Sequence, residues 1–127
     1  MPSDSPVDRL REIVENCDRI AAYTADMDFE TYAGDMKTRD AVERCLARIS
    51  EAACKIGSYI ETRYPETDWA GARGVGNLLR HQYDGIEDLD IWNGVVTDVP
   101  RLRAAASSEI QRLISASESG GDGAGRG

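Results

Sequence analysis

The only histidine of the chain, His81, lies in a short stretch that also carries arginine, asparagine and tyrosine side chains. A histidine has an ordinary pKa of about 6.5, so it can exchange a proton near neutral pH. Such a group could act as a general acid or base while a neighbouring guanidinium stabilises charge that develops on a phosphate. The candidate side chains of this stretch are Arg73, Asn77, Arg80, His81 and Tyr83.

The spacing of these residues matters as much as their types. If the stretch is helical, steps of four residues place Arg73, Asn77 and His81 on one face, with Arg80 at its edge. Asn77 would then lie one turn before the histidine, where it can orient the ring or donate to a phosphate oxygen. The alternative is structural, because a histidine near a helix end often bonds to a carbonyl or to a carboxylate such as Asp84.

Composition limits the classes of protein that this chain can represent. Its 127 residues are enough for one domain with a real core, and its net charge of −8 disfavours nonspecific binding of nucleic acid through a broad basic patch. No apolar run approaches the length of about eighteen residues that a membrane span needs. The N-terminal segment lacks the basic and apolar regions of a signal peptide, so we expect a cytoplasmic protein.

The three cysteines, Cys17, Cys45 and Cys54, are an odd number and have no Cys-x-x-Cys spacing. Each follows an amphipathic pattern, which predicts reduced cysteines in the core. The one histidine also excludes a histidine-rich metal site, and the sequence indicates no metal or other cofactor.

Two long segments carry apolar residues at helical spacing. The first begins after Ser5, with Pro6 at the first helical position, and ends near Ala25. The second begins near Thr38 and is predicted to continue to Tyr64, since the following proline disfavours the helical conformation before it. A short helical turn is expected between them, at residues 28–32.

A third segment begins at Trp69, with Asp68 as its cap, and includes Gly71, Gly74 and Gly76. Each glycine inside a helix costs roughly 0.5–1 kcal/mol relative to alanine. Three of them suggest that another helix or a ligand approaches the backbone closely. The alternative is that the glycines form a loop and the helix begins only after them.

The remaining sequence predicts two further helices and a tail. Gly85 suits the end of the third helix, and a short apolar segment to Val96 follows; the sequence Gly94-Val-Val-Thr97 is taken as its end. Asp98 is predicted to cap a fifth helix that has Pro100 in its first turn. The chain is therefore expected to be all-α, an antiparallel up-and-down bundle of four to five helices over residues 1–118, with a disordered glycine-rich tail over 119–127.

Several of these residues together resemble a known family. The segment from 69 to 102 has the order Trp69, Asn77-x-x-x-His81-x-Tyr83, Gly85-Ile86, Asp90-Ile91-Trp92 and Asp98-Val-Pro100-x-Leu102. This order resembles the HepT-like toxin family of the HEPN superfamily, and the helix pattern is similar over roughly residues 7 to 115.

The resemblance implies a HEPN-like fold and a metal-independent endoribonuclease. Members act as the toxin of a toxin–antitoxin pair whose antitoxin is a minimal nucleotidyltransferase, and they form homodimers with one cleft lined by both subunits. His81 would help to activate the ribose 2′-hydroxyl or protonate the leaving oxygen, which makes RNA the substrate. Tyr83 matches the tyrosine that the partner modifies with AMP, so that added negative charge would repel RNA phosphate.

One position departs from the family pattern. The family has an arginine immediately before the asparagine, and this chain has Gly76 there. Arg73 or Arg80 would have to supply the cation. Two alternatives follow: a non-catalytic HEPN-fold protein that binds a nucleotidyltransferase or a nucleotide, and a structural helical dimer. Trp69 and Trp92 are expected in the bundle core or a dimer contact.

Overall fold

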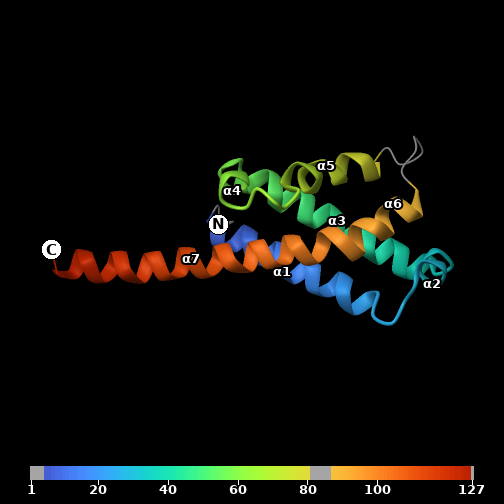
Figure 1. The fold of residues 1–127 in the computed structure, drawn as a ribbon, viewed down its shortest axis with the longest axis horizontal. Coiled ribbons are helices and arrows are strands. Elements are labelled where there is room, and N and C mark those ends of the chain that lie inside the picture. The colour runs from blue at the N-terminus through green and yellow to red at the C-terminus, as the bar shows by residue number, and fades with distance from the viewer. Residues whose placement is uncertain (1–4, 81–86, 127) are drawn as a thin grey trace.

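Four long helices make up the bundle and run alternately in opposite directions (Figure 1). The computed structural model describes residues 5–80 and 87–126, with side chains to residue 118. The long helices are α1 (Pro6–Tyr23), α3 (Met36–Ile56), α5 (Trp69–Arg80) and α7 (Val99–Arg126), and the shorter ones are α2 (Phe29–Ala33), α4 (Tyr59–Arg63) and α6 (Asp88–Asn93). The described residues contain no strand. The all-α class and the antiparallel bundle are thus confirmed.

Helix α3 lies at the centre of the bundle. It packs against α1 and α5, and α1 also packs against α7. The apolar faces predicted for the first two long helices are buried, because the residues spaced by three and four positions all point to this centre. The core residues of these two helices are Leu10, Ile13, Cys17, Ile20, Val42, Cys45, Leu46, Ile49, Ala52, Ala53 and Ile56.

The predicted helix from Thr38 to Tyr64 is wrong in one respect, because it is interrupted. Helix α3 ends at Ile56, and Gly57 has a φ of 92°, a conformation that only glycine adopts readily. Helix α4 then begins at Tyr59 in a new direction. The apolar spacing does not reveal this break, because Ile60 is buried, as it would also be in an uninterrupted helix.

The predicted cap at Asp98 is also wrong. Helix α6 is followed by a π-helical turn, η2 (Gly94–Asp98), which continues directly into α7. The backbone N–H of Val99 bonds to the carbonyl of Gly94 across this wider turn, so no new helix begins and no side-chain cap is needed. The segment Gly94–Thr97, predicted as the end of the fourth helix, is part of this turn.

The two tryptophans and the three cysteines are buried to different extents. Trp69 is buried as expected, and the half-buried Trp92 packs on Tyr32 with ring centroids 5.1 Å apart. Cys17 and Cys45 are buried, but Cys54 is exposed, so the core assignment of this third cysteine is wrong.

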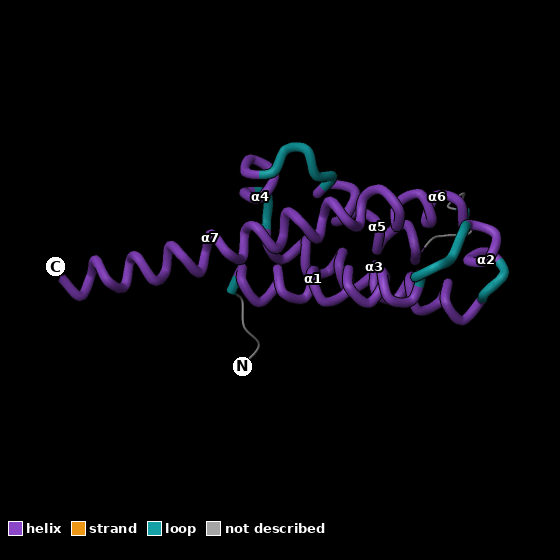
Figure 2. The backbone as a smooth tube through the Cα atoms, turned by 60° about the horizontal axis from the view of Figure 1, so that its bottom comes forward, coloured by secondary structure: helices purple, strands orange, loops and turns teal. Residues whose placement is uncertain are grey.

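Helix α7 extends beyond the other helices (Figures 1 and 2). The predicted boundary between a domain over 1–118 and a disordered tail over 119–127 stays a prediction. None of the helices in the described ranges is long and apolar enough to cross a membrane.

Candidate functional site on helix α5

Helix α5 carries the predicted site residues and begins where the sequence indicated. The Asp68 carboxylate accepts a hydrogen bond of 2.8 Å from the backbone N–H of Gly71, which satisfies a free donor at the helix start. The helix then continues through all three glycines to Arg80. The loop alternative for the glycines is therefore wrong.

The structure places only part of the predicted stripe. Arg73 and Asn77 are one turn apart on the same side of α5, and Asn77 is exposed. Both His81 and Tyr83 lie outside the described residues, which stop at Arg80 and resume at Glu87. The positions of the histidine and the tyrosine therefore stay predictions.

Arg73 is bound within the protein. Its guanidinium forms an ion pair with the carboxylate of Glu61 on α4, and only 27% of its side chain is exposed. One of its terminal nitrogens is fully buried. This arginine ties α5 to α4, and its charge is offset by its partner.

Gly76 lies at a close contact between α5 and α3. Its backbone N–H donates to the hydroxyl oxygen of Ser50 at 3.2 Å, and the same hydroxyl donates to the carbonyl of Arg73 at 2.6 Å. A Cβ atom at Gly76 would lie 2.7 Å from the Ser50 oxygen and 3.0 Å from its Cβ. A side chain at this position therefore requires Ser50 or one of the two helices to shift.

The other two glycines have different surroundings. A Cβ at Gly71 would collide with the carboxylate of Asp68, so this glycine leaves room for the cap. A Cβ at Gly74 would have nothing within 4 Å. The close approach predicted from the glycines therefore involves Gly76, and the approaching group is a helix of the same chain.

Arg80, at the end of α5, extends back over this contact. Its Nη1 atom lies 3.7 Å from the place that a Cβ of Gly76 would occupy. The side chain is exposed, and it has no carboxylate partner among the described residues. Its position in the last turn of the helix is one where a positive charge is favourable.

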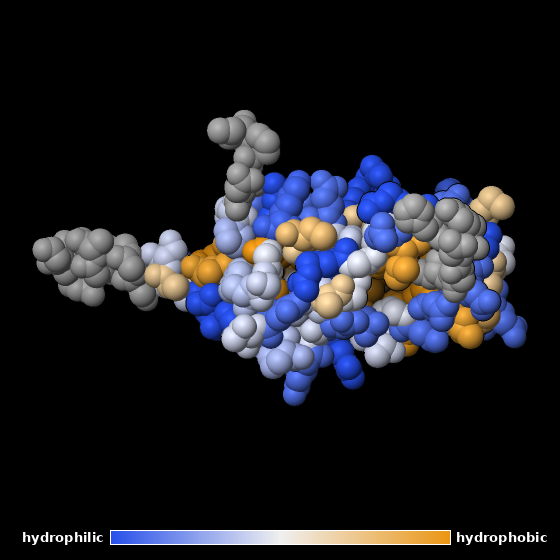
Figure 3. All heavy atoms as spheres, turned by 90° about the horizontal axis from the view of Figure 1, so that it is seen from above, coloured by the Kyte–Doolittle hydropathy of each residue, from blue (hydrophilic) through white to orange (hydrophobic). Residues whose placement is uncertain are grey.

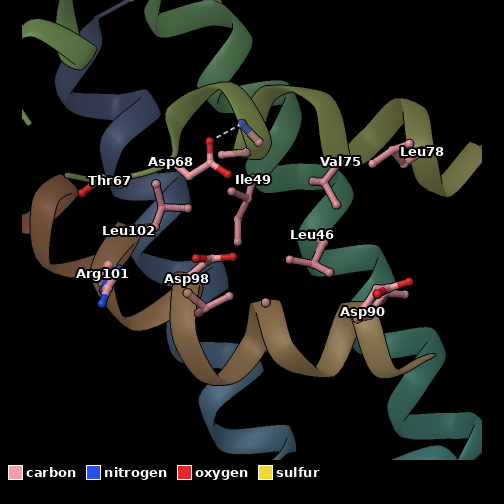
Figure 4. Close-up of a pocket in the computed structure, with 15 residues that line it drawn as sticks. Leu46, Ile49, Thr67, Asp68, Val75, Leu78, Asp90, Asp98, Arg101 and Leu102 are labelled. Atoms are coloured by element: carbon pink, nitrogen blue, oxygen red, sulfur yellow. Dashed lines mark hydrogen bonds between the residues drawn. The ribbon is translucent and has the colours of Figure 1, made fainter. Parts of the chain in front are cut away.

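A groove of about 410 Å³ opens on the other flank of α5, between this helix and the segment of α6, η2 and α7 (Figure 4). Leu46 and Ile49 of α3 project into it, and Val75 of α5 also lines it. Figure 3, which looks onto α4 and α5, shows apolar atoms in a hollow among hydrophilic side chains. The groove is therefore an apolar surface beside the helix that carries the candidate site.

The charges around the groove are mostly negative. Of the described residues, Asp68, Asp90 and Asp98 line it, together with a single cation, Arg101. Carboxylates repel phosphate, so this groove does not suit an RNA backbone. The successive residues of a helix turn by about 100°, which puts Leu78 on the groove side and Asn77 on the other. Helix α5 thus separates an apolar, acidic flank from a polar flank with Asn77 and Arg80, called the basic flank here.

A buried carboxylate that sequence reasoning missed lies where α4 meets α7. Glu109 is fully buried and accepts hydrogen bonds from Tyr59, Arg63, Tyr64 and Arg112 at 2.6–3.1 Å. Burial by itself raises the pKa of Glu109, but the hydrogen bonds from the two arginines and two tyrosines outweigh it and lower the pKa to about 2. Glu109 is therefore ionised at neutral pH.

The polar residues that sequence reasoning missed share one signal. Ser50 and Glu109 each interrupt an apolar helical face, Ser50 beside Ile49 and Glu109 beside Ile110. A polar side chain on a buried face needs a hydrogen-bond partner. The sequence could therefore have identified Ser50 and Glu109 as residues with such a partner. Glu61 gave no such signal, because a glutamate on a short, mostly polar helix looks like an ordinary surface residue.

Within the described ranges, no three His, Cys, Asp or Glu side chains are grouped so that they could hold a metal ion.

Comparison with known proteins supports the resemblance seen in the motifs. Residues 13–109 match the family model described as Ribonuclease HepT-like. "Putative RNase MJ0125" of Methanocaldococcus jannaschii is 31% identical over 105 residues, which cover 83% of this chain and 87% of that protein.

Two more relatives agree with this match. "Putative RNase MJ0127" of the same organism is 35% identical, with coverage of 83% and 84% of the two chains. "Probable ribonuclease HepT" of Thermococcus cleftensis is 32% identical over 96 residues, with coverage of 76% and 87%. No solved structure was found to match. The family match extends from α1 into α7 and includes all of α5, and the chain therefore belongs to the ribonuclease HepT-like family.

Proposed function

We propose that this protein is a metal-independent endoribonuclease and that His81 performs its acid–base chemistry. The observation that carries the proposal is the family match over residues 13–109, which includes the helix that leads to the histidine. Relatives of similar length are named as RNases. The basic flank of α5, which carries Asn77 and Arg80, supplies polar and cationic side chains next to His81 in the sequence.

The proposed reaction uses the ribose of RNA as its own nucleophile. A general base removes the proton of the 2′-hydroxyl, and the 2′-oxygen attacks the adjacent phosphorus. The bond to the 5′-oxygen breaks, that oxygen receives a proton from a general acid, and a 2′,3′-cyclic phosphate remains. His81 fills one of these two roles, and Asn77 orients the ring or the phosphate. DNA lacks the 2′-hydroxyl and would not be cleaved.

We also propose a homodimer in which His81 of two copies lines one cleft. The groove beside α5 supports association, because it leaves apolar surface uncovered and Leu78 at its edge is 54% exposed. Sedimentation should show a dimer for the wild type and a monomer for Leu78→Asp. Val96→Asp, at an exposed apolar position outside this groove, is the control. A wild type that stays monomeric at high concentration would rule out a cleft that two copies share.

As part of the same proposal, the protein is a cytoplasmic toxin that a minimal nucleotidyltransferase neutralises by adding AMP to Tyr83. The added phosphate would repel the RNA backbone from the adjacent basic flank. Mass spectrometry of the protein expressed with its nucleotidyltransferase should find the added mass on the wild type and on Tyr23→Phe, an exposed control. Modification of Tyr83→Phe to the same extent would contradict the assignment.

A second candidate function is a non-catalytic protein that binds the nucleotidyltransferase. The observation in its favour is Gly76, which replaces the family arginine and fits closely against Ser50. Without another cation near the histidine, the fold could bind a partner but would not stabilise the charge of a cleavage transition state.

Expression of the protein alone in a bacterial host tests the two functions. We expect growth arrest with decay of total RNA, and we expect both to disappear in His81→Ala. The purified wild type should cleave RNA in the presence of EDTA, and Gln111→Ala, on the exposed surface of α7, should cleave equally well. Normal growth and intact RNA from a folded, well-expressed protein would support the non-catalytic function.

A further inference from the structure

Five arginines lie near the proposed site in the sequence, and most of them already have partners. Arg63 binds Glu109, Arg73 binds Glu61, and Arg103 binds Asp18. A guanidinium whose charge is offset by a carboxylate attracts phosphate less strongly, and it must lose its partner before it can bind one. These three arginines are therefore poor candidates for contact with RNA.

The other two arginines lie on opposite flanks of α5. Arg101 lines the groove together with three aspartates, whose negative charge disfavours a phosphate. Arg80 is exposed on the basic flank and has no ion pair with another described residue. It directly precedes His81 in the sequence, and a trans peptide bond places successive Cα atoms about 3.8 Å apart.

The guanidinium of Arg80 lies beside Gly76. The side chain extends back by one turn, and its Nη1 atom lies 3.7 Å from the point where a Cβ of Gly76 would be. A side chain at Gly76 would collide with Ser50, so it would need Ser50 or a helix to shift. The guanidinium that lies beside residue 76 is thus that of Arg80.

We propose that Arg80 is the residue that contacts the scissile phosphate, and that Arg73 has a structural role in holding α5 against α4. Arg80 donates hydrogen bonds to the non-bridging phosphate oxygens as their negative charge grows in the transition state. This inference rests on the proposed ribonuclease function and specifies which arginine serves it.

A matched pair of variants, Arg80→Gln and Arg73→Gln, tests the assignment. Each removes one positive charge from α5 and keeps a polar side chain. The measurements are kcat/KM on a labelled RNA oligonucleotide, binding of the same sequence made with 2′-O-methyl ribose, which cannot be cleaved, and the melting temperature.

For Arg80→Gln we expect kcat/KM to fall about 100-fold, as when a donor to a developing oxyanion is removed. The slope of log binding constant against log salt should fall by about one, and the melting temperature should stay unchanged. Arg80→Lys should recover part of the loss in kcat/KM, because it restores the charge without the planar fork of donors.

For Arg73→Gln we expect the opposite pattern. The melting temperature should fall because Glu61 loses its partner, and kcat/KM of the folded protein should stay within a few-fold of the wild type. Full activity in Arg80→Gln, or loss of activity in Arg73→Gln at an unchanged melting temperature, would overturn the assignment.

The outcomes separate this inference from the function on which it rests. If the wild type cleaves RNA no better than His81→Ala, the ribonuclease proposal fails. Binding of the 2′-O-methyl oligonucleotide then still decides the role of Arg80, since equal binding by the wild type and Arg80→Gln at every salt concentration would refute it.

Discussion

The contact between α3 and α5 and the contact between α4 and α7 hold the bundle together in contrasting ways. At the first, Gly76 has no side chain, and the helix backbone comes within hydrogen-bond distance of Ser50. At the second, the buried carboxylate of Glu109 gathers two arginines and two tyrosines. The first contact depends on shape and should be insensitive to pH, whereas the second depends on charge and should weaken in acid.

The short helix α4 links the two contacts. Its Glu61 binds Arg73 of α5, while its Tyr59 and Arg63 bind Glu109 of α7. Burial, and secondarily the charge of Glu109, raise the pKa of Tyr59 to about 12, so its hydroxyl stays protonated and donates at neutral pH. The break at Gly57 therefore has a structural role, because it turns α4 so that it can reach both neighbours.

The largest effect is expected for Glu109→Gln, which keeps the size of the side chain and removes its charge. The folded pKa is about 2, below the ordinary value of 4.5, so the stabilisation is complete above about pH 4.5 and is lost as the pH falls toward 2. At neutral pH we expect the free energy of unfolding of the variant to be lower than that of the wild type by up to about 3 kcal/mol. Urea denaturation between about pH 7 and 2.5 measures this loss of stability and its dependence on pH.

In this experiment the free energy of unfolding of the wild type should fall in acid more steeply than that of Glu109→Gln. Glu118→Gln, at an exposed position of the same helix, should follow the wild type. Parallel pH profiles for the wild type and Glu109→Gln would show that charge does not hold the α4–α7 contact.

Gly76→Ala should have the next largest effect, because its methyl group would lie within 2.7 Å of the Ser50 hydroxyl. Such overpacking costs about 1–3 kcal/mol, and this loss should not change with pH. Adding Ser50→Gly removes the atoms that collide, so a double-mutant cycle should show coupling between the two positions. If the losses of stability in the two single variants were simply additive, the destabilisation by Gly76→Ala would not come from a collision with Ser50.

The smallest effect, and of opposite sign, is expected for Gly74→Ala. Its Cβ would point into open space, so alanine should stabilise the helix by about 0.5–1 kcal/mol. The change is chemically identical to the one at Gly76 and lies two residues away on the same helix. Thermal unfolding of both variants compares them directly, and a loss of stability in Gly74→Ala would indicate that another molecule covers this face.

The sequence by itself determined most of the long helices and the faces that they bury, but not the break at Gly57 or the π-helical turn before α7. The spacing of Leu10, Ile13 and Cys17, or of Val42, Leu46 and Ile49, repeats with the period of the helix, so it encodes local structure and core together. Asp68 identified the start of α5 because a cap acts over only three residues. The Asn-x-x-x-His-x-Tyr motif led to the family for a similar reason, since its residues are close in the chain.

Only the tertiary structure gave different roles to residues of the same type that lie close together in the sequence. Gly74 and Gly76 are equivalent in sequence, and only the approach of Ser50, 26 positions earlier, separates them. Arg73 and Arg80 were equal candidates until Glu61, from another helix, was found to bind one of them. Glu109 became a charged anchor through Arg63, 46 residues away. These assignments depend on contacts between distant segments, whose distances the periodicity of a single helix does not encode.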